Sequence, residues 1–176
     1  MVVWLILLFL TPCLAAVPDR VCAKCHAEIA ARYGKTAMAQ SSGAVARLRP
    51  PPGAPALGVG GQGWKLRVSR RDPPFQHAVA VGWFLGSGRV GRSYLFETQG
   101  QLFQFPFSSY AATGQWGASP GFNHAQRFDL NRAVETACLQ CHSAITAHPT
   151  PAAPELNGIS CERCHGAGEA HVRQPS

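Results

Sequence analysis

The sequence predicts a mixed α and β fold with low regular structure, in which short helices surround three copies of one motif and a small antiparallel β segment occupies the middle. Three observations predict this fold. The pattern Cys-x-x-Cys-His occurs at residues 22–26, 138–142 and 161–165. Residues 64–107 contain runs of alternating apolar and polar side chains, which are typical of half-buried strands. The 18 Gly and 14 Pro among 176 residues disfavour long regular elements.

Residues 1–16 have the pattern of a secretory signal peptide. An apolar run at residues 2–10 is followed by Thr-Pro-Cys-Leu-Ala-Ala, which predicts cleavage after Ala15 or Ala16. The run is too short for a comfortable membrane span. We therefore expect a periplasmic or otherwise exported protein whose residues 17–176 form a single domain. No Lys or Arg precedes the apolar run, so a retained leader is the alternative, and only then is membrane contact expected.

Each Cys-x-x-Cys-His copy is an attachment site for a c-type haem, since two thiols can form thioethers with the vinyl groups while the imidazole ligates the iron. With seven Cys and seven His, chance would produce the pattern only about 0.01 times in this chain. A zinc ribbon or a dithiol redox site is the alternative, but zinc does not explain a His after every pair. We therefore predict three covalent haems on six cysteines and three proximal histidines: Cys22, Cys25, Cys138, Cys141, Cys161, Cys164, His26, His142 and His165.

The segment after the first motif, Ala27 to Gln40, is Ala-rich and predicts a helix that carries Met38. Residues 41–63 are rich in Ser, Gly, Pro and Ala and predict a loop. Residues 58–63 and 86–91 both match Gly-x-Gly-x-x-Gly, but alternating runs follow both, whereas a dinucleotide fingerprint opens a helix. Neither match therefore predicts a nucleotide site.

The β segment at residues 64–107 predicts four antiparallel strands, at 64–70, 77–85, 92–98 and 101–107. A hairpin turn at Gln99 and Gly100 would pair Phe96 with Phe103 and Tyr94 with Phe105, which puts four aromatic rings on one face. Either another strand layer or a haem could cover that face. Pro106 predicts that the last strand lies at an edge of the sheet.

Residues 109–132 predict irregular structure, and residues 133–173 hold the two C-terminal haem motifs. These copies share the longer pattern Cys-x-x-Cys-His-x-Ala-x-x-Ala-His, which ends at His148 and His171. The first copy has Arg32 at the position of that last His, so its haem is expected to differ in ligation. A His six residues after its proximal partner cannot reach the opposite face of the same porphyrin, so His148 or His171 would serve a neighbouring haem.

Residues 158–172, with Phe84-Leu-Gly-Ser-Gly and Arg92-Ser-Tyr-Leu-Phe, resemble a family of exported multihaem c-type cytochromes related to the tetrahaem cytochrome of nitrifying bacteria, of the c-554 and c-prime type. The likeness spans about residues 20–173. Members often continue into tetratricopeptide repeats. The resemblance implies closely spaced haems with distal ligands from distant parts of the chain. This sequence differs in having Ala167 where the family has Pro, three motifs where it has four, and no repeats, so a repeat-bearing segment or partner is expected to be missing.

The sixth iron ligands are predicted from this resemblance and from the residues available. By resemblance, His171 matches the last His of the family's Cys-x-x-Cys-His-Gly-Pro-Gly-x-x-His, and Met38 lies where a distal ligand is usual. Met38 is the sole thioether besides the start residue, so one haem is expected to have His/Met ligation; packing against a porphyrin is the alternative for Met38. The other haems would take His124 and His171. His77 is the reserve candidate, and His148 ranks last because the resemblance matches it to no ligand.

The formal charge of +7 would suggest a nucleic-acid or membrane partner. Three haems would add roughly six propionate charges, which largely cancels this excess. The Arg residues are therefore expected to be mostly propionate partners and solvated surface, and the partners to be redox proteins. We expect electron transfer, and whether the protein also catalyses a reaction stays open. The enzyme alternative is a small oxidoreductase with one open-site haem acting on a nitrogen oxide or similar molecule, helped by His77 and Arg89. A haem-bearing interaction or sensor module is a third possibility.

Overall fold

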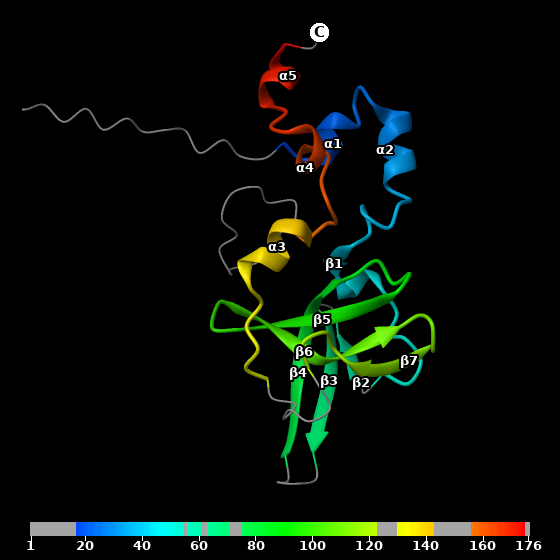
Figure 1. The fold of residues 1–176 in the computed structure, drawn as a ribbon, viewed down its shortest axis with the longest axis vertical. Helices are drawn as coiled ribbons and strands as arrows, with labels where there is room; N and C mark the ends of the chain where they lie inside the picture. Colours follow the sequence, from blue (N-terminus) through cyan, green and yellow to red (C-terminus); the bar gives the residue numbers. More distant parts are fainter. Residues whose placement is uncertain are drawn as a thin grey trace, which may run out of the picture.

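The computed structural model describes residues 17–54, 56–60, 63–70, 75–122, 130–142 and 156–174. In this part of the chain a seven-stranded antiparallel sheet lies at one end and short helices gather at the other (Figure 1). The fold class predicted from the sequence is confirmed. The leader, His124 and His148 lie outside the described residues. None of the described helices has the length and apolar character needed to cross a membrane.

The helices are short and lie at the three motifs. Their bounds are α1 (Asp19–Cys22), α2 (Ala27–Tyr33), α3 (Thr136–His142), α4 (Glu162–His165) and α5 (Glu169–Arg173). The first and third motifs each form one turn, in which His26 N–H donates to Cys22 O at 3.0 Å and His165 N–H donates to Cys161 O at 3.1 Å. The helix expected up to Gln40 is wrong in its second half, because α2 ends at Tyr33 before Gly34 and turns follow.

The strands are β1 (Ser42–Ala44), β2 (Ala56–Gly60), β3 (Gly63–Arg70), β4 (Phe75–Leu85), β5 (Gly91–Thr98), β6 (Gln101–Tyr110) and β7 (Gln115–Ala118). They lie in the order β2-β3-β4-β5-β6-β7, and β1 pairs with β4. The four predicted strands are present. The loop predicted at 41–63 is wrong in part, as is the irregular stretch at 109–132, because β1, β2 and β7 fall there. These short strands contain Gly, Ala and Ser, so their pairing depends on neighbouring strands rather than on local propensity.

The β5–β6 hairpin turns at Gln99 and Gly100, whose φ angles of 53° and 77° fit a two-residue turn with both central residues in the left-handed region. The predicted pairing of Phe96 with Phe103 is confirmed. The predicted pairing of Tyr94 with Phe105 is wrong, because the register shifts between Ser93 and Leu95, so that Ser93 pairs with Ser108.

The edge-strand prediction from Pro106 is also wrong. Strand β6 lies between β5 and β7, and Phe107 to Tyr110 pair with β7. Pro106 is buried in the stretch of β6 where the register with β5 shifts. Proline lacks an N–H group, so it is tolerated at such an irregularity even inside a sheet.

The sheet buries side chains on both faces. On one face the predicted aromatic residues cluster with Trp64, Leu66 and Val81 of the neighbouring strands β3 and β4. No motif residue belongs to this cluster among those the structure describes, so the sheet has an apolar core of its own. On the other face, Leu95 and Leu102 pack with Leu139 of α3 and with Leu156. Leu139 is one of the two residues between the cysteines of the second motif, so its burial anchors that motif on the sheet.

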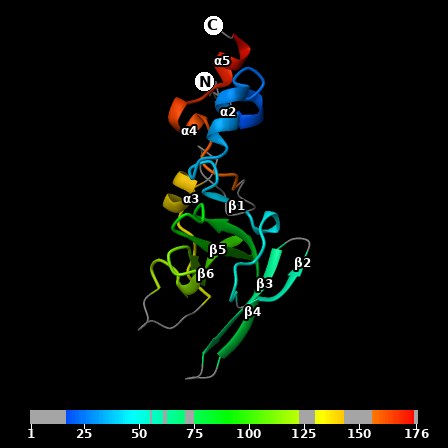
Figure 2. The ribbon, with the colours of Figure 1, turned by 90° about the vertical axis from the view of Figure 1, so that its right-hand side faces the viewer.

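The remaining helices lie beyond one end of the sheet. Figures 1 and 2 show α1, α2, α4 and α5 grouped together, with α3 between this group and the strands. The N-terminal and C-terminal parts of the described chain therefore lie side by side. The second motif, in α3, lies between the sheet and the first and third motifs, although the three motifs are far apart in the sequence.

Candidate haem-binding sites

The first and third motifs pack against each other through buried backbone groups. Asp19 Oδ1 accepts a hydrogen bond from Cys161 N–H at 2.9 Å, and Tyr33 OH donates to Ile159 O at 2.7 Å. Ile159 N–H donates to Met38 O at 3.2 Å. These contacts pair donors and acceptors that would otherwise be unsatisfied where the two segments meet. They hold the third motif directly on the N-terminal helices.

Gly158 allows this close approach. Its φ is +80°, and a Cβ atom there would lie 1.9 Å from Ala39 O, a distance that no side chain can adopt. Glycine is therefore required at this position both for its backbone conformation and for space.

The thiols of these two motifs are close together. Burial raises the pKa of Cys161 to about 12, with smaller contributions of the same sign from Asp19 and from Cys22, which is within hydrogen-bonding reach. Burial also raises the pKa of Tyr33, assisted by Cys164. This environment disfavours additional negative charge and suits a neutral sulfur, as in a thioether. Two haems attached here would lie next to each other.

The proximal histidine of the first motif faces His171 of α5. The two ring centroids are 6.1 Å apart and the ring planes differ by 18°. A metal–imidazole bond is about 2 Å long, so two rings that bind one metal ion from opposite sides have centroids about 6 Å apart. Both side chains are exposed, so burial does little to hold this arrangement. The observed centroid spacing equals that of an axial ligand pair, but the two rings are stacked, so they would have to turn their nitrogen edges toward a shared iron.

Glu162, within the third motif, holds the turn that leads to His171. Its side chain is buried, and Oε1 accepts a hydrogen bond from Gly168 N–H at 2.7 Å. Gly168 directly precedes α5, where Glu169 and Arg173 form an ion pair at 2.8 Å. The position of His171 therefore depends on the third motif, while its ring faces the first.

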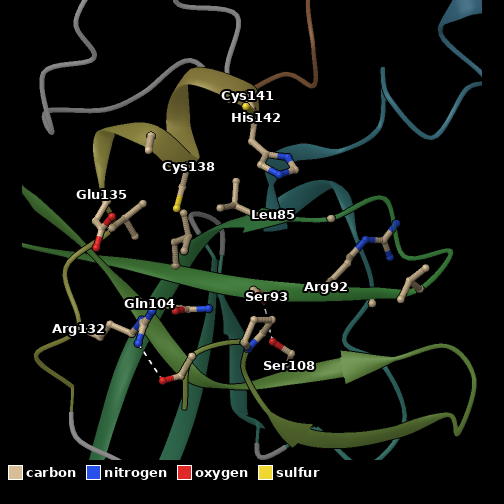
Figure 3. A pocket seen from close by; sticks show the side chains of 18 of the residues that line it. Leu85, Arg92, Ser93, Gln104, Ser108, Arg132, Glu135, Cys138, Cys141 and His142 are labelled. Carbon is tan, nitrogen blue, oxygen red and sulfur yellow. Dashed lines mark hydrogen bonds between the residues drawn. The ribbon is translucent and has the colours of Figure 1, made fainter. Parts of the chain in front are cut away.

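The second motif forms one wall of a cavity of about 740 Å³ between α3 and strands β4 to β6 (Figure 3). Cys138, Cys141 and His142 all line it. Cavities of about 300–1,000 Å³ are usual for organic ligands and cofactors. Polar groups also line the cavity, and they come mainly from the sheet and from the segment before α3: Arg92, Ser93, Gln104, Ser108, Arg132 and Glu135.

His142 is tied to the third motif through Ser42 of β1. Ser42 Oγ donates to His142 O and accepts from Gly158 N–H at 2.9 Å. The side-chain Nδ1 of His142 is buried and has no hydrogen-bond partner in the part of the chain that the structure describes. Such an orphaned polar atom is unusual in a folded protein and fits a ring whose environment is completed by a bound group.

Exposed apolar side chains also fit a bound porphyrin at these sites. The large apolar residues most exposed in the described chain are Ile29, Met38, Val90 and Val172, with exposed fractions of 60%, 47%, 80% and 42%. Ile29 and Met38 follow the first motif in sequence, Val172 follows His171, and Val90 lines the cavity of the second motif. A flat apolar cofactor would remove such surface from water. The residues present therefore fit haem.

The other predicted ligands have different outcomes. His77 is an exposed residue near the start of β4, at the opposite end of the strand from Leu85, which lines the cavity. This position offers no support for His77 as a ligand. The side chain of Met38 is exposed and therefore accessible to a bound haem, and its role as a sixth iron ligand stays a prediction. His124 and His148 lie outside the described residues and stay predictions.

Sequence reasoning missed Asp19, Ser42 and Glu162, because each acts through a backbone group that is distant in sequence or lies across a turn. No local pattern marks such residues. Arg92 was part of a stretch that carried the resemblance but was given no role of its own, whereas the structure places it in the wall of the cavity.

Comparison with known proteins agrees with these observations. Residues 110–166, which include the second and third motifs, match the family described as cytochrome c554 and c-prime. The expected likeness to multihaem c-type cytochromes is confirmed, and such a cytochrome family implies covalently bound haem c. Among solved structures, the fold is similar to that of the outer cell wall cytochrome OcwA, with a TM-score of 0.55 and 16% identity over 91% of this chain. The chain spans about a third of that cytochrome, 33%. No curated protein sequence matches it.

Proposed function

From this likeness we propose that the chain is an electron carrier with three covalently attached haems that works outside the cytoplasm and exchanges electrons with redox partner proteins. The observation that carries the proposal is the convergence of the three motifs. Cys22 lies beside Cys161, and Ser42 joins the second motif to the segment before the third. Electron transfer requires redox centres that lie close together, and this packing would bring three of them into one group.

In this proposal each cysteine pair forms two thioethers, and the following histidine is the proximal ligand. The bound haem supplies a reversible one-electron change at iron. The chain itself orients the ligands, covers the apolar faces and sets the local charge. For the first motif, the geometry supports His26 and His171 as the axial pair. A second imidazole gives a lower potential than a thioether does.

Met38 then remains for a different haem, as the thioether of a His/Met pair. Its backbone carbonyl accepts the Ile159 N–H, which places residue 38 beside the third motif. His124 is proposed as the remaining distal ligand. Export rests on the apolar leader and on c-type haem attachment, which is completed outside the cytoplasm.

A second candidate function is small-molecule oxidoreduction at the second motif. The described lining of its cavity contains one imidazole, His142, and no thioether. An iron that lacked a sixth protein ligand there would lie next to polar groups such as Arg92 and Ser93, which could orient a small polar molecule.

Two measurements on the purified full-length protein test these proposals. Denaturing mass spectrometry should give the polypeptide mass plus three haems. Low-temperature EPR of the ferric protein should show only low-spin signals if the protein is a carrier with full coordination. A high-spin signal would favour the oxidoreductase, and fewer than three retained haems after full maturation would contradict both.

A further inference from the structure

The guanidinium group of Arg92 is held in one position at the wall of the second-motif cavity. Its Nη2 donates to Ser87 O at 2.7 Å, and its Cζ lies 5.1 Å from the centroid of the Phe84 ring. On the other side is Gly88, where a Cβ atom would come within 2.7 Å of Arg92 Cζ. A charged group fixed in this way is preorganised for binding, because little rotamer freedom remains to be lost.

Arg92 is short of a counter-charge. Its Nε is a buried donor with no hydrogen-bond partner among the described residues, and no carboxylate in that part of the chain forms an ion pair with it. Among the described residues that line the cavity, Glu135 is the one carboxylate, and it lies on the opposite side from Arg92 in Figure 3. A partly buried cation without an anionic partner is costly, so the arrangement calls for an anion in the cavity.

The cavity geometry indicates which part of a bound haem would supply this anion. The vinyl groups and the propionates lie on opposite edges of the porphyrin, and the vinyl edge must face the cysteines. Figure 3 shows Cys138 and Arg92 on different sides of the cavity, with Cys138 nearer to Glu135. A porphyrin attached at Cys138 would thus direct its propionates away from Glu135.

We propose that Arg92 binds a propionate of the haem attached at Cys138 and Cys141, which orients that haem in its cavity and raises its potential. This inference rests on the proposed haem attachment. A guanidinium matches a carboxylate in a two-bond geometry, and positive charge near the iron disfavours the ferric form. The other guanidinium of the lining, Arg132, is exposed, donates to Gly121 O at 2.8 Å and lies on the side of Glu135, so it is the weaker candidate.

The test compares four variants of the haem-loaded protein: Arg92→Gln, Arg92→Lys, Arg132→Gln and Arg89→Gln. Arg89→Gln removes the same charge from an exposed side chain in the same turn and is the matched control. Each variant is analysed by mass spectrometry for haem number and by spectroelectrochemical titration for the haem potentials.

Arg92→Gln should lower one potential and leave the other two unchanged, and Arg92→Lys should lower the same potential by less. The control and Arg132→Gln should cause much smaller shifts. Unchanged potentials in Arg92→Gln overturn the proposal, as does a larger shift in Arg132→Gln. If Arg92→Gln is not recovered folded, Arg92→Lys decides by the same criterion. Wild-type protein without haem at the second motif would instead refute the proposed function.

Discussion

The imidazole rings of His26 and His171 face each other with centroids 6.1 Å apart, although one residue follows the first helix and the other lies in the last. This contact brings together the two ends of the described chain. His26 lies a few residues after α1, which is four residues long, and His171 lies in α5, which is five residues long. Neither helix contains a buried residue. Helices this short are unstable alone, so the positions of both rings depend on contacts between motifs.

Replacing His171 with Ala is expected to convert one haem from low-spin to high-spin, because it removes one of two axial imidazoles. The other two haems should keep their EPR signals. His77→Ala is the control, since it removes an exposed imidazole near the start of β4, at the end of that strand away from the cavity of the second motif. An unchanged EPR spectrum in His171→Ala would exclude His171 as a ligand.

Replacing Ser42 with Ala is expected to lower the free energy of unfolding by about 1–3 kcal/mol. The change leaves both the His142 carbonyl and the Gly158 N–H without their buried partner. Denaturant unfolding of the haem-loaded protein measures the effect. Ser69→Ala, on an exposed position of β3, should change stability by less than about 0.5 kcal/mol. Equal effects at the two positions would show that the Ser42 bridge contributes nothing.

Replacing Gly158 with Ala is expected to cost at least about 2 kcal/mol more than replacing Gly100 with Ala. Both glycines have positive φ, at 80° and 77°, so backbone strain is matched. Only at Gly158 does the added Cβ meet another group, Ala39 O, whereas nothing lies within 4 Å at Gly100. Thermal unfolding of the two variants gives the difference. Similar destabilisation would mean that the third motif does not pack this closely on residue 39.

Replacing Met38 with Leu should abolish any sulfur-to-iron charge-transfer band near the red edge of the ferric spectrum and lower one haem potential. The two side chains have nearly equal volume, so packing effects should stay small. Optical spectroscopy and redox titration are the measurements. If the wild-type protein has no such band, or if every potential is unchanged, Met38 is a packing residue against the porphyrin.

Protein without haem, produced by replacing all six motif cysteines with Ser, is expected to keep its sheet and lose its helical end. The sheet has its own aromatic cluster around Trp64, Tyr94 and Phe105, whereas the helices leave apolar residues exposed. Hydrogen exchange should therefore show protection in β3 to β6 and rapid exchange in residues 17–41 and 156–174. Protected helices in this variant would show that they pack without haem.

The chemistry of this protein could be predicted from residues that are close together in sequence. Two thiols and an imidazole within five residues predict a haem attachment site whatever the rest of the chain does, and the alternation of residues 64–107 correctly predicted the four main strands. The pairing of Tyr94 with Phe105 was predicted wrongly, because a register shift depends on contacts along both strands rather than on the turn that joins them. The same limit explains why the edge-strand prediction from Pro106 was wrong. Strand β7, which pairs with the strand of Pro106, is too short to be recognised from its own four residues.

The sequence by itself determined which atoms can attach to haem and which segments form the central sheet, because both depend on spacing within a few residues. Only the tertiary structure decided which motifs are neighbours, that the ring of His171 lies against that of His26, and that Arg92 places a buried Nε without a described partner in the wall of the second-motif cavity. These relationships depend on single contacts such as Asp19 to Cys161 and Ser42 to His142. Each joins residues at least 100 positions apart, and no periodicity in the chain encodes such a contact.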